Sequence, residues 1–140
     1  MTHPQTASAL LIRSDGKVLL GLRSAAKAKW PNHWDAIGGH VETNETLEAA
    51  LIRELQEEIG IIPTDFRRVA ALREKSAIDE ESRLHYIFIV RDWEGEPSLR
   101  NDEHSEVQWF SLEEMRSLTN ITYSEYLALV ESENITRDKR

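Results

Sequence analysis

One stretch of the chain, Gly39 to Ile61, constrains its fold more than any other. A glycine pair, Gly38-Gly39, opens it, and Gly60 stands near its end, where a helix commonly terminates. The apolar spacing between these glycines predicts a helix over residues 45–59. Side chains on that helix therefore point in fixed directions, so the sequence shows which residues share each face of the helix.

Three acidic side chains share one face of the predicted helix. Glu54, Glu57 and Glu58 fall within an arc of about 100°. The neighbouring arc is apolar and can face a core; it holds Leu51, Ile52, Leu55 and Ile59. Like charges at these spacings repel by about 0.2–0.5 kcal/mol for each adjacent pair, and a cation from outside the stretch would relieve that repulsion. The alternative interpretation is a solvated acidic face with no ligand.

The ligand types available limit which cation this could be. Carboxylates are hard oxygen ligands, and the chain has no cysteine and no pair of histidines at ligand spacing. Such a donor set favours Mg²⁺, or Mn²⁺ in its place, over zinc.

The spacing of the whole stretch resembles one known family. Gly39, then Glu45 after five residues, then the run from Arg53 to Ile61 after seven more, match the Nudix box. That pattern is GX5EX7REUXEEXGU, where U is an aliphatic residue, and it specifies far more than a lone glycine motif. The chain is therefore similar to the Nudix hydrolases. The resemblance implies an α/β/α sandwich with a mixed β-sheet, in which the box forms a catalytic loop–helix–loop.

The resemblance also implies an activity. Nudix enzymes hydrolyse a nucleoside diphosphate linked to another group, and a divalent metal ion neutralises the phosphates. We therefore expect an Mg²⁺-dependent hydrolase of a nucleoside diphosphate derivative, with nucleoside triphosphates among the candidate substrates. The alternative function is a Nudix-fold module that binds or senses nucleotides without catalysis. Such members often have eroded boxes, whereas the box here is intact.

Residue roles follow from the match to the box. Glu54, Glu57 and Glu58 occupy the metal-binding positions, with Glu54 a ligand or a base, and the carbonyl of Gly39 is a further expected ligand. Arg53 is expected to orient the glutamates through ion pairs rather than to contact substrate.

Two more positions in the box have predicted roles. Glu45 is a predicted ion-pair partner of Arg53. Gly38 and Gly39 are expected to contact the substrate. They are also expected to adopt backbone conformations that other residues avoid.

A catalytic base outside the box is also expected. Several Nudix enzymes use a glutamate in a loop that precedes a strand with tryptophan. Here Glu103 stands six residues before Trp109 and downstream of a WEGEP run, as in the mutator-type triphosphate pyrophosphohydrolases. Glu103 is the first candidate and Glu106 the second; a polar surface loop is the alternative.

Substrate contacts are predicted at three positions. Arg23 ends a strand where the family often places an arginine that contacts phosphate, although a solvated strand end has the same appearance. Trp30 and Trp34 precede the box, and one of them, with Trp34 as the candidate, is expected to stack on a base.

The stretch before the box departs from the commonest family pattern. Many members carry aromatic-Pro-Gly-Gly, whereas this chain has Ala36-Ile37-Gly38-Gly39. The departure weakens an assignment to the oxidised-guanine triphosphatases, whose base pocket often uses that aromatic. An isopentenyl diphosphate isomerase is also disfavoured, because its catalytic cysteine has no counterpart here. The sequence therefore does not name the substrate.

Length and charge bound the remaining possibilities. A chain of 140 residues predicts one domain, residues 1–140. The net charge of −8 argues against a general nucleic-acid surface. No apolar run approaches 18 residues and no signal peptide is visible, so we expect no membrane partner and a cytoplasmic location. Because the family often dimerises, a second copy of this chain is a candidate partner.

The remaining elements are predicted from alternation and turn residues. Residues 6–23 should form a β-hairpin around Ser14-Asp15-Gly16, and residues 76–81 a turn. Ser111 and Glu114 have capping-box spacing, and Thr43 or Asn44 is the predicted N-cap of the box helix. The other expected strands are Ala36 to Glu42, Phe66 to Glu74, Arg83 to Trp93 and Glu106 to Phe110; the other expected helices are Leu112 to Leu118 and Thr122 to Glu133. This order suggests an α/β layered fold with a frayed end after residue 135.

Overall fold

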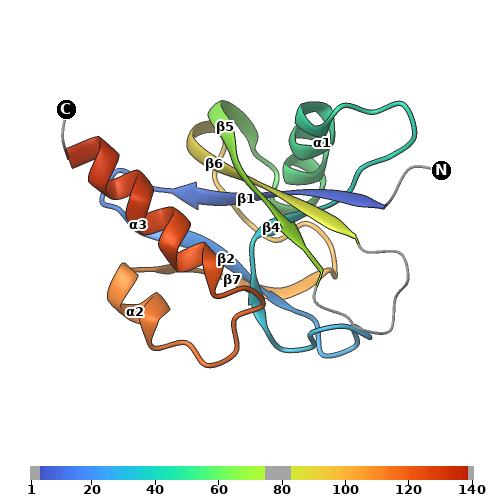
Figure 1. Cartoon of the computed structure of the whole chain (residues 1–140). Coiled ribbons are helices and arrows are strands. Elements are labelled where there is room, and N and C mark those ends of the chain that lie inside the picture. The colour runs from blue at the N-terminus through green and yellow to red at the C-terminus, as the bar shows by residue number, and fades with distance from the viewer. Residues whose placement is uncertain (1–3, 75–82, 139–140) are drawn as a thin grey trace.

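The computed structural model of the chain describes residues 4–74 and 83–138. The seven strands in these residues form one mixed sheet between helices (Figure 1). The strands are β1 (Gln5–Ile12), β2 (Val18–Arg23), β3 (Trp34–Asp35), β4 (Ile37–His40), β5 (Ile62–Arg73), β6 (Leu84–Glu94) and β7 (His104–Phe110). The helices are α1 (Leu47–Ile59), α2 (Leu112–Arg116) and α3 (Glu125–Asp138). The turn predicted at residues 76–81 lies outside the described residues.

Strand β1 is the centre of the sheet. The main path runs β3-β2-β1-β6-β5, while β4 pairs with β1 and β7 pairs with β2. All of these pairs are antiparallel except β1 with β6, which is parallel, so the sheet is mixed as expected. Strand β1 therefore lies between β4, which carries the first residue of the box, and β6, which starts after the undescribed segment.

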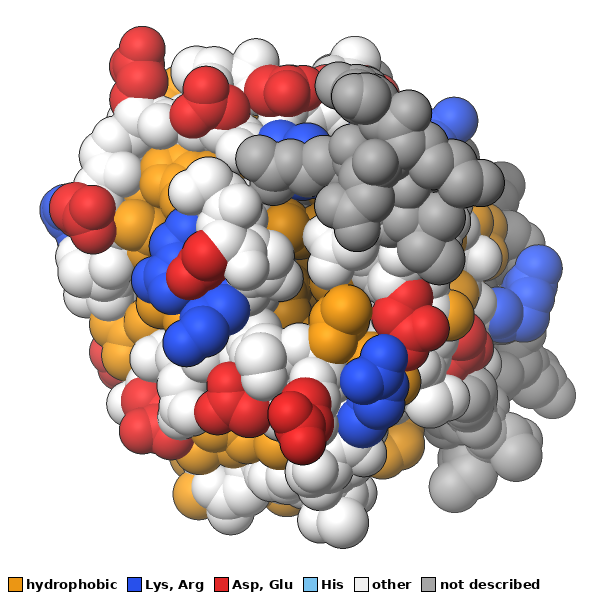
Figure 2. All heavy atoms as spheres, turned by 90° about the vertical axis from the view of Figure 1, so that its left-hand side faces the viewer, with side chains coloured by type: hydrophobic (Ala, Val, Ile, Leu, Met, Phe, Trp, Pro, Cys, Tyr) orange, Lys and Arg blue, Asp and Glu red, His pale blue; other side chains and the backbone are white. Residues whose placement is uncertain are grey.

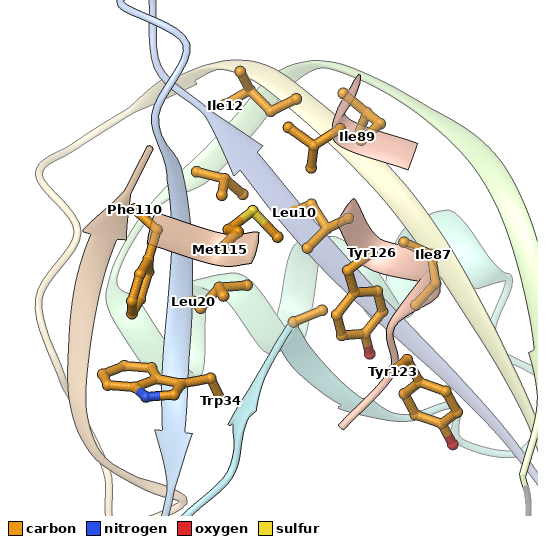
Figure 3. Packing of buried hydrophobic residues seen from close by; sticks show 13 residues of the cluster. Leu10, Ile12, Leu20, Trp34, Ile87, Ile89, Phe110, Met115, Tyr123 and Tyr126 are labelled. Atoms are coloured by element: carbon orange, nitrogen blue, oxygen red, sulfur yellow. The ribbon is translucent and has the colours of Figure 1, made fainter. Parts of the chain in front are cut away.

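Alternation along the strands produces two cores, one on each face of the sheet. Successive side chains of a strand point to opposite faces. Leu10 and Ile12 pack on one face with Tyr126 of α3 (Figure 3), while Ala9 and Leu11 pack on the other face with the α1 side chains. Figure 1 shows α1 and α3 on opposite sides of the sheet. The predicted α/β/α sandwich is confirmed.

Element ends differ from prediction in several places. The N-cap of α1 is Thr46, whose hydroxyl accepts from the Ala49 N–H at 3.1 Å, so the predicted caps Thr43 and Asn44 are wrong. Gly60 ends the helix at φ 71°, and the capping box of Ser111 is confirmed. Strand β5 begins four residues earlier than predicted. Helix α3 begins at Glu125 rather than at residue 122 and continues to Asp138, beyond the predicted fraying point.

Two surface properties bear on partners. No helix in the described part of the chain is long and apolar enough to cross a membrane. On the end of the molecule where α3 terminates, acidic and basic side chains are interspersed among apolar ones (Figure 2). The described residues on that face therefore present no uniformly basic surface. Four basic side chains line the cavity described next. The cytoplasmic location stays a prediction.

Candidate active site

A cavity of about 150 Å³ opens where α3 stops covering its face of the sheet. Thr6 and Ser8 line the cavity, while Leu10 and Ile12, on the same face of β1, lie under α3. The change from polar to apolar along one side of β1 therefore marks the limit of the core. The lining residues come from seven parts of the chain: Thr6, Ser8, Arg23, Lys27, Lys29, Trp30, Asp35, Ala36, Gly38, Gly39, His40, Glu58, Glu74, Arg83, His85, Glu103, His104, Thr122, Tyr123 and Tyr126.

The glutamates of α1 stand in three different environments. The Glu57 side chain is 57% exposed and the Glu54 side chain 15% exposed. Glu58 is buried, with 2% exposed, and lines the cavity. Helical spacing thus places three like residues on one side of α1, but their surroundings differ: Glu54 lies against Gly39 of β4, and Glu58 faces His104 of β7.

Arg53 holds this acidic side together. Its guanidinium donates to both carboxylate oxygens of Glu45, at 2.8 and 2.9 Å, and to Glu54 at 2.9 Å. It also donates to the carbonyl of His40 at 2.9 Å and to Glu57 at 3.3 Å. The predicted ion pair with Glu45 is confirmed. A guanidinium with this set of partners orients the carboxylates and the backbone of β4 relative to α1.

Burial changes the acidity of two of the glutamates. Burial, together with the nearby charges of Glu54 and Glu103, raises the pKa of Glu58 to about 9. Burial also raises the pKa of Glu54, against the opposing effect of Arg53. Glu58 Oε2 is buried with no hydrogen-bond partner among the described residues. A carboxylate in this position needs a cation to become ionised at neutral pH.

These groups fit a divalent metal ion. Glu54, Glu57, Glu58 and the Gly39 carbonyl supply only oxygen, which suits Mg²⁺ and Mn²⁺, and the unpartnered Glu58 oxygen is a free ligand atom. Within residues 4–74 and 83–138, no three acidic or imidazole groups already converge as a metal cluster. The ion pairs of Arg53 with Glu54 and Glu57 hold two of the candidate ligands instead.

The glycine pair is needed for close approach rather than for unusual backbone angles. Neither Gly38 nor Gly39 has a positive φ, so the predicted reason for these glycines is wrong. A Cβ on Gly39 would lie 2.6 Å from the carboxyl carbon of Glu54, and one on Gly38 would lie 2.0 Å from the carbonyl oxygen of Ala7. The absent side chains allow α1 and β1 to pack against β4.

Basic side chains and the candidate base line the other side of the cavity. Arg23 donates to the carbonyl of Lys29 at 2.8 and 3.0 Å and lies 3.6 Å from a carboxylate oxygen of Asp35. Lys27 forms an ion pair with Glu103, and this hydrogen bond holds the pKa of Glu103 below its usual range. Glu106 is not among the lining residues. The geometry therefore favours Glu103 over Glu106.

The two tryptophans before the box are separated by the fold. Trp34 is 7% exposed and packs edge-on against Phe110 in the core, with ring centroids 4.8 Å apart (Figure 3). Its ring cannot stack on a bound base without leaving that core, so the choice of Trp34 as the base contact is at odds with the structure. Trp30 is 39% exposed and lines the cavity.

Several lining residues were not identified from the sequence. Asp35 accepts hydrogen bonds from Thr122 and from Tyr126, both at 2.7 Å, which ties α3 to the edge of the cavity. His104 Nδ1 is buried without a partner in the described residues, 3.9 Å from Glu58. The spacing of His85 and His104 in the sequence carried no ligand signal. Their position depends on strand pairing between distant segments.

Known proteins with similar sequences belong to one family. A family profile described as the NUDIX domain matches residues 2–130. The 8-oxo-dGTP diphosphatase of Escherichia coli K12 is 37% identical over 102 residues, which cover 73% of this chain and 76% of that protein. The CTP pyrophosphohydrolase of the same strain is 37% identical over 106 residues, covering 76% of this chain and 75% of that protein.

A solved structure supports the same assignment. The crystal structure of a MutT NUDIX hydrolase from Burkholderia pseudomallei has a TM-score of 0.79 and 25% identity, covering 94% of this chain and 98% of that one. Nudix hydrolases generally use divalent metal ions, which agrees with the carboxylates on α1. From its box, its fold and its relatives, the chain belongs to the Nudix hydrolase family.

Proposed function

We propose that this enzyme hydrolyses a diphosphate linkage in a nucleoside triphosphate, with Mg²⁺ as cofactor and Mn²⁺ able to replace it. One observation carries the proposal: the buried, unpartnered carboxylate of Glu58 shares a single cavity with basic side chains. A buried carboxylate that lacks a cation, beside basic side chains, is complementary to a metal–polyphosphate complex. Two relatives are named for such substrates, 8-oxo-dGTP and CTP.

The basic side chains explain how an acidic protein can take a polyanion. The net charge is −8, yet Arg23, Lys27, Lys29 and Arg83 all line the cavity. We assign phosphate binding to Arg23, Lys27 and Lys29. Local charges of this kind outweigh a distant net charge, because salt screens charges that are more than about 8 Å apart in solvent.

The α1 residues have distinct proposed roles. Glu54, Glu57, Glu58 and the Gly39 carbonyl would hold the metal ion, which neutralises phosphate charge and acidifies bound water. Arg53 positions these carboxylates through its ion pairs. Glu103 accepts a proton from the attacking water, and its low pKa keeps it ionised for that purpose.

A substrate panel with matched variants tests the proposal. Purified protein with Mg²⁺ is incubated with canonical and oxidised nucleoside triphosphates, nucleotide sugars, ADP-ribose and dinucleoside polyphosphates, and the products are identified. We expect turnover of a triphosphate that falls about 10²-fold or more in Glu57→Gln. Glu48→Gln is the control, because Glu48 is an exposed glutamate of α1 outside the cavity.

The outcomes separate the candidate functions. Equal turnover in Glu57→Gln and wild type would contradict the metal assignment. Binding of nucleotides without any hydrolysis would instead identify a nucleotide-binding or sensing module.

A further inference from the structure

Buried polar atoms without partners gather in the cavity. In the described part of the chain, four of the five such side-chain atoms belong to lining residues: Glu58 Oε2, Arg83 Nε, His85 Nε2 and His104 Nδ1. Leaving a buried donor or acceptor unpaired is unfavourable, so each of these atoms is a candidate contact for a ligand. Glu58 and His104 belong with the α1 carboxylates. Arg83 and His85 have no assigned contact with the substrate in the chemistry proposed above.

Arg83 and His85 point to the same side of one strand. Arg83 directly precedes β6, its carbonyl accepts from the Glu74 N–H at 2.9 Å, and His85 is the second residue of β6. Residues two apart in a strand face the same side of the sheet. That side is the one on which Ile87 and Ile89 pack under α3. The two side chains therefore enter the polar end of the same cavity from one side of the strand.

Thr6 fixes the orientation of the histidine. Strand register places Thr6 opposite His85, and the Thr6 hydroxyl lies 2.6 Å from His85 Nδ1. Burial lowers the pKa of His85, so its ring is neutral at pH 7. When the hydroxyl donates to Nδ1, the ring proton is on Nε2. Arg83 Nε always carries a proton. The cavity then presents two unpaired N–H donors and no acceptor from this residue pair.

We propose that Arg83 and His85 select the base of the substrate by donating to an edge with two adjacent acceptors. The O6 and N7 atoms of guanine form such an edge, whereas adenine presents an N6 amino donor beside N7. This inference rests on the proposed function and names the substrate class of that same cavity. With adenine bound, one buried N–H would face another donor, and such mismatches are strongly rejected. The enzyme should prefer 6-oxopurine over 6-aminopurine nucleotides by about 5- to 150-fold.

Kinetics with three substrates test the proposal. Values of kcat/KM are measured with Mg²⁺ for GTP, ATP and ribose 5-triphosphate, which has no base. Wild type should prefer GTP to ATP, and this preference should be largely lost in Arg83→Met and in His85→Leu, mainly through a higher KM for GTP. The ratio of GTP to ribose 5-triphosphate should fall in both variants. Arg116→Met is the matched control, because Arg116 pairs with Glu131 at the surface, away from the cavity.

Each result has one meaning. A wild type that hydrolyses no nucleoside triphosphate of the substrate panel overturns the proposed function and this inference together, whereas one that hydrolyses CTP but neither GTP nor ATP overturns this inference alone. A wild type that hydrolyses GTP, but has no preference over ATP or keeps it in both variants, overturns this inference alone. A measurement on wild type avoids any folding defect: guanosine monophosphate should shift the His85 Nε2–H signal in ¹H–¹⁵N spectra of the imidazole. An unshifted signal at saturating nucleotide would refute the contact.

Discussion

Glu58 should make the metal-free protein less stable as the pH rises. Burial and two neighbouring carboxylates raise the pKa of Glu58 from 4.5 to about 9. Between these values the folded state keeps a proton that the unfolded state releases, so the free energy of unfolding falls with increasing pH. The stabilisation is complete below pH 4.5 and is lost as the pH rises through about 9.

The expected magnitude follows from one proton. A difference of one bound proton changes the free energy of unfolding by about 1.4 kcal/mol per pH unit. Both pH 6.0 and pH 7.5 lie inside the window, so the contribution of Glu58 should decrease by about 2 kcal/mol between them. The side chain is 2% exposed, and solvent screening therefore reduces the effect little.

Denaturant unfolding in EDTA measures this contribution. The free energy of unfolding is determined for wild type and Glu58→Gln at both pH values, because glutamine mimics the protonated carboxyl. Wild type should lose about 2 kcal/mol relative to Glu58→Gln on going to pH 7.5. Glu48→Gln, at an exposed position on the same helix, should show no pH-dependent difference from wild type. A constant difference for Glu58→Gln would mean that Glu58 is already ionised in the folded protein, which would refute the reasoning.

Three further predictions concern residues around the cavity. Trp34→Ala should destabilise the fold by about 3–5 kcal/mol in thermal or denaturant unfolding, whereas Trp30→Ala should raise the KM for a nucleotide and leave stability unchanged; the reverse pattern would contradict the placement of the two rings. Gly39→Ala should abolish the rise in melting temperature on adding Mg²⁺, since its Cβ would lie 2.6 Å from the Glu54 carboxyl carbon. Tyr126→Phe should lower the free energy of unfolding by about 1–3 kcal/mol, because the buried Tyr126 hydroxyl donates a hydrogen bond to Asp35 at 2.7 Å. An unchanged denaturation midpoint would disprove that contact.

The box helix was predictable because its signals are local and agree with one another. The glycine at Gly60 ends the helix in the left-handed conformation, and the distance of eight residues from Glu45 to Arg53 allows the observed bidentate pair. The N-cap was missed because Thr43, Asn44 and Thr46 are all acceptable caps. Asn44 instead adopts a positive φ of 66° in the preceding loop.

The cavity was less predictable because it is assembled from distant segments. Nothing near Trp34 in the sequence shows that its backbone bridges Ile121 and that its ring packs on Phe110. Thr6 and His85 are separated by 79 residues and meet only through the parallel pairing of β1 with β6. Patterns of residue type predict such strands, but the register between them depends on the whole fold.

The fold gives Glu57 and Glu58 different environments that the box sequence alone does not show. The two residues are adjacent and chemically identical, and the sequence treats both as ligands. In the structure Glu57 is 57% exposed and pairs with Arg53, whereas Glu58 is buried, lacks a partner for Oε2 and has a pKa of about 9. If Glu58 holds the metal as proposed, it should release a proton at neutral pH when metal binds. Metal affinity should consequently rise with pH up to about 9. Calorimetric measurement of Mg²⁺ binding at a series of pH values tests this. An affinity that does not depend on pH would assign the binding to Glu57 and Glu54 alone.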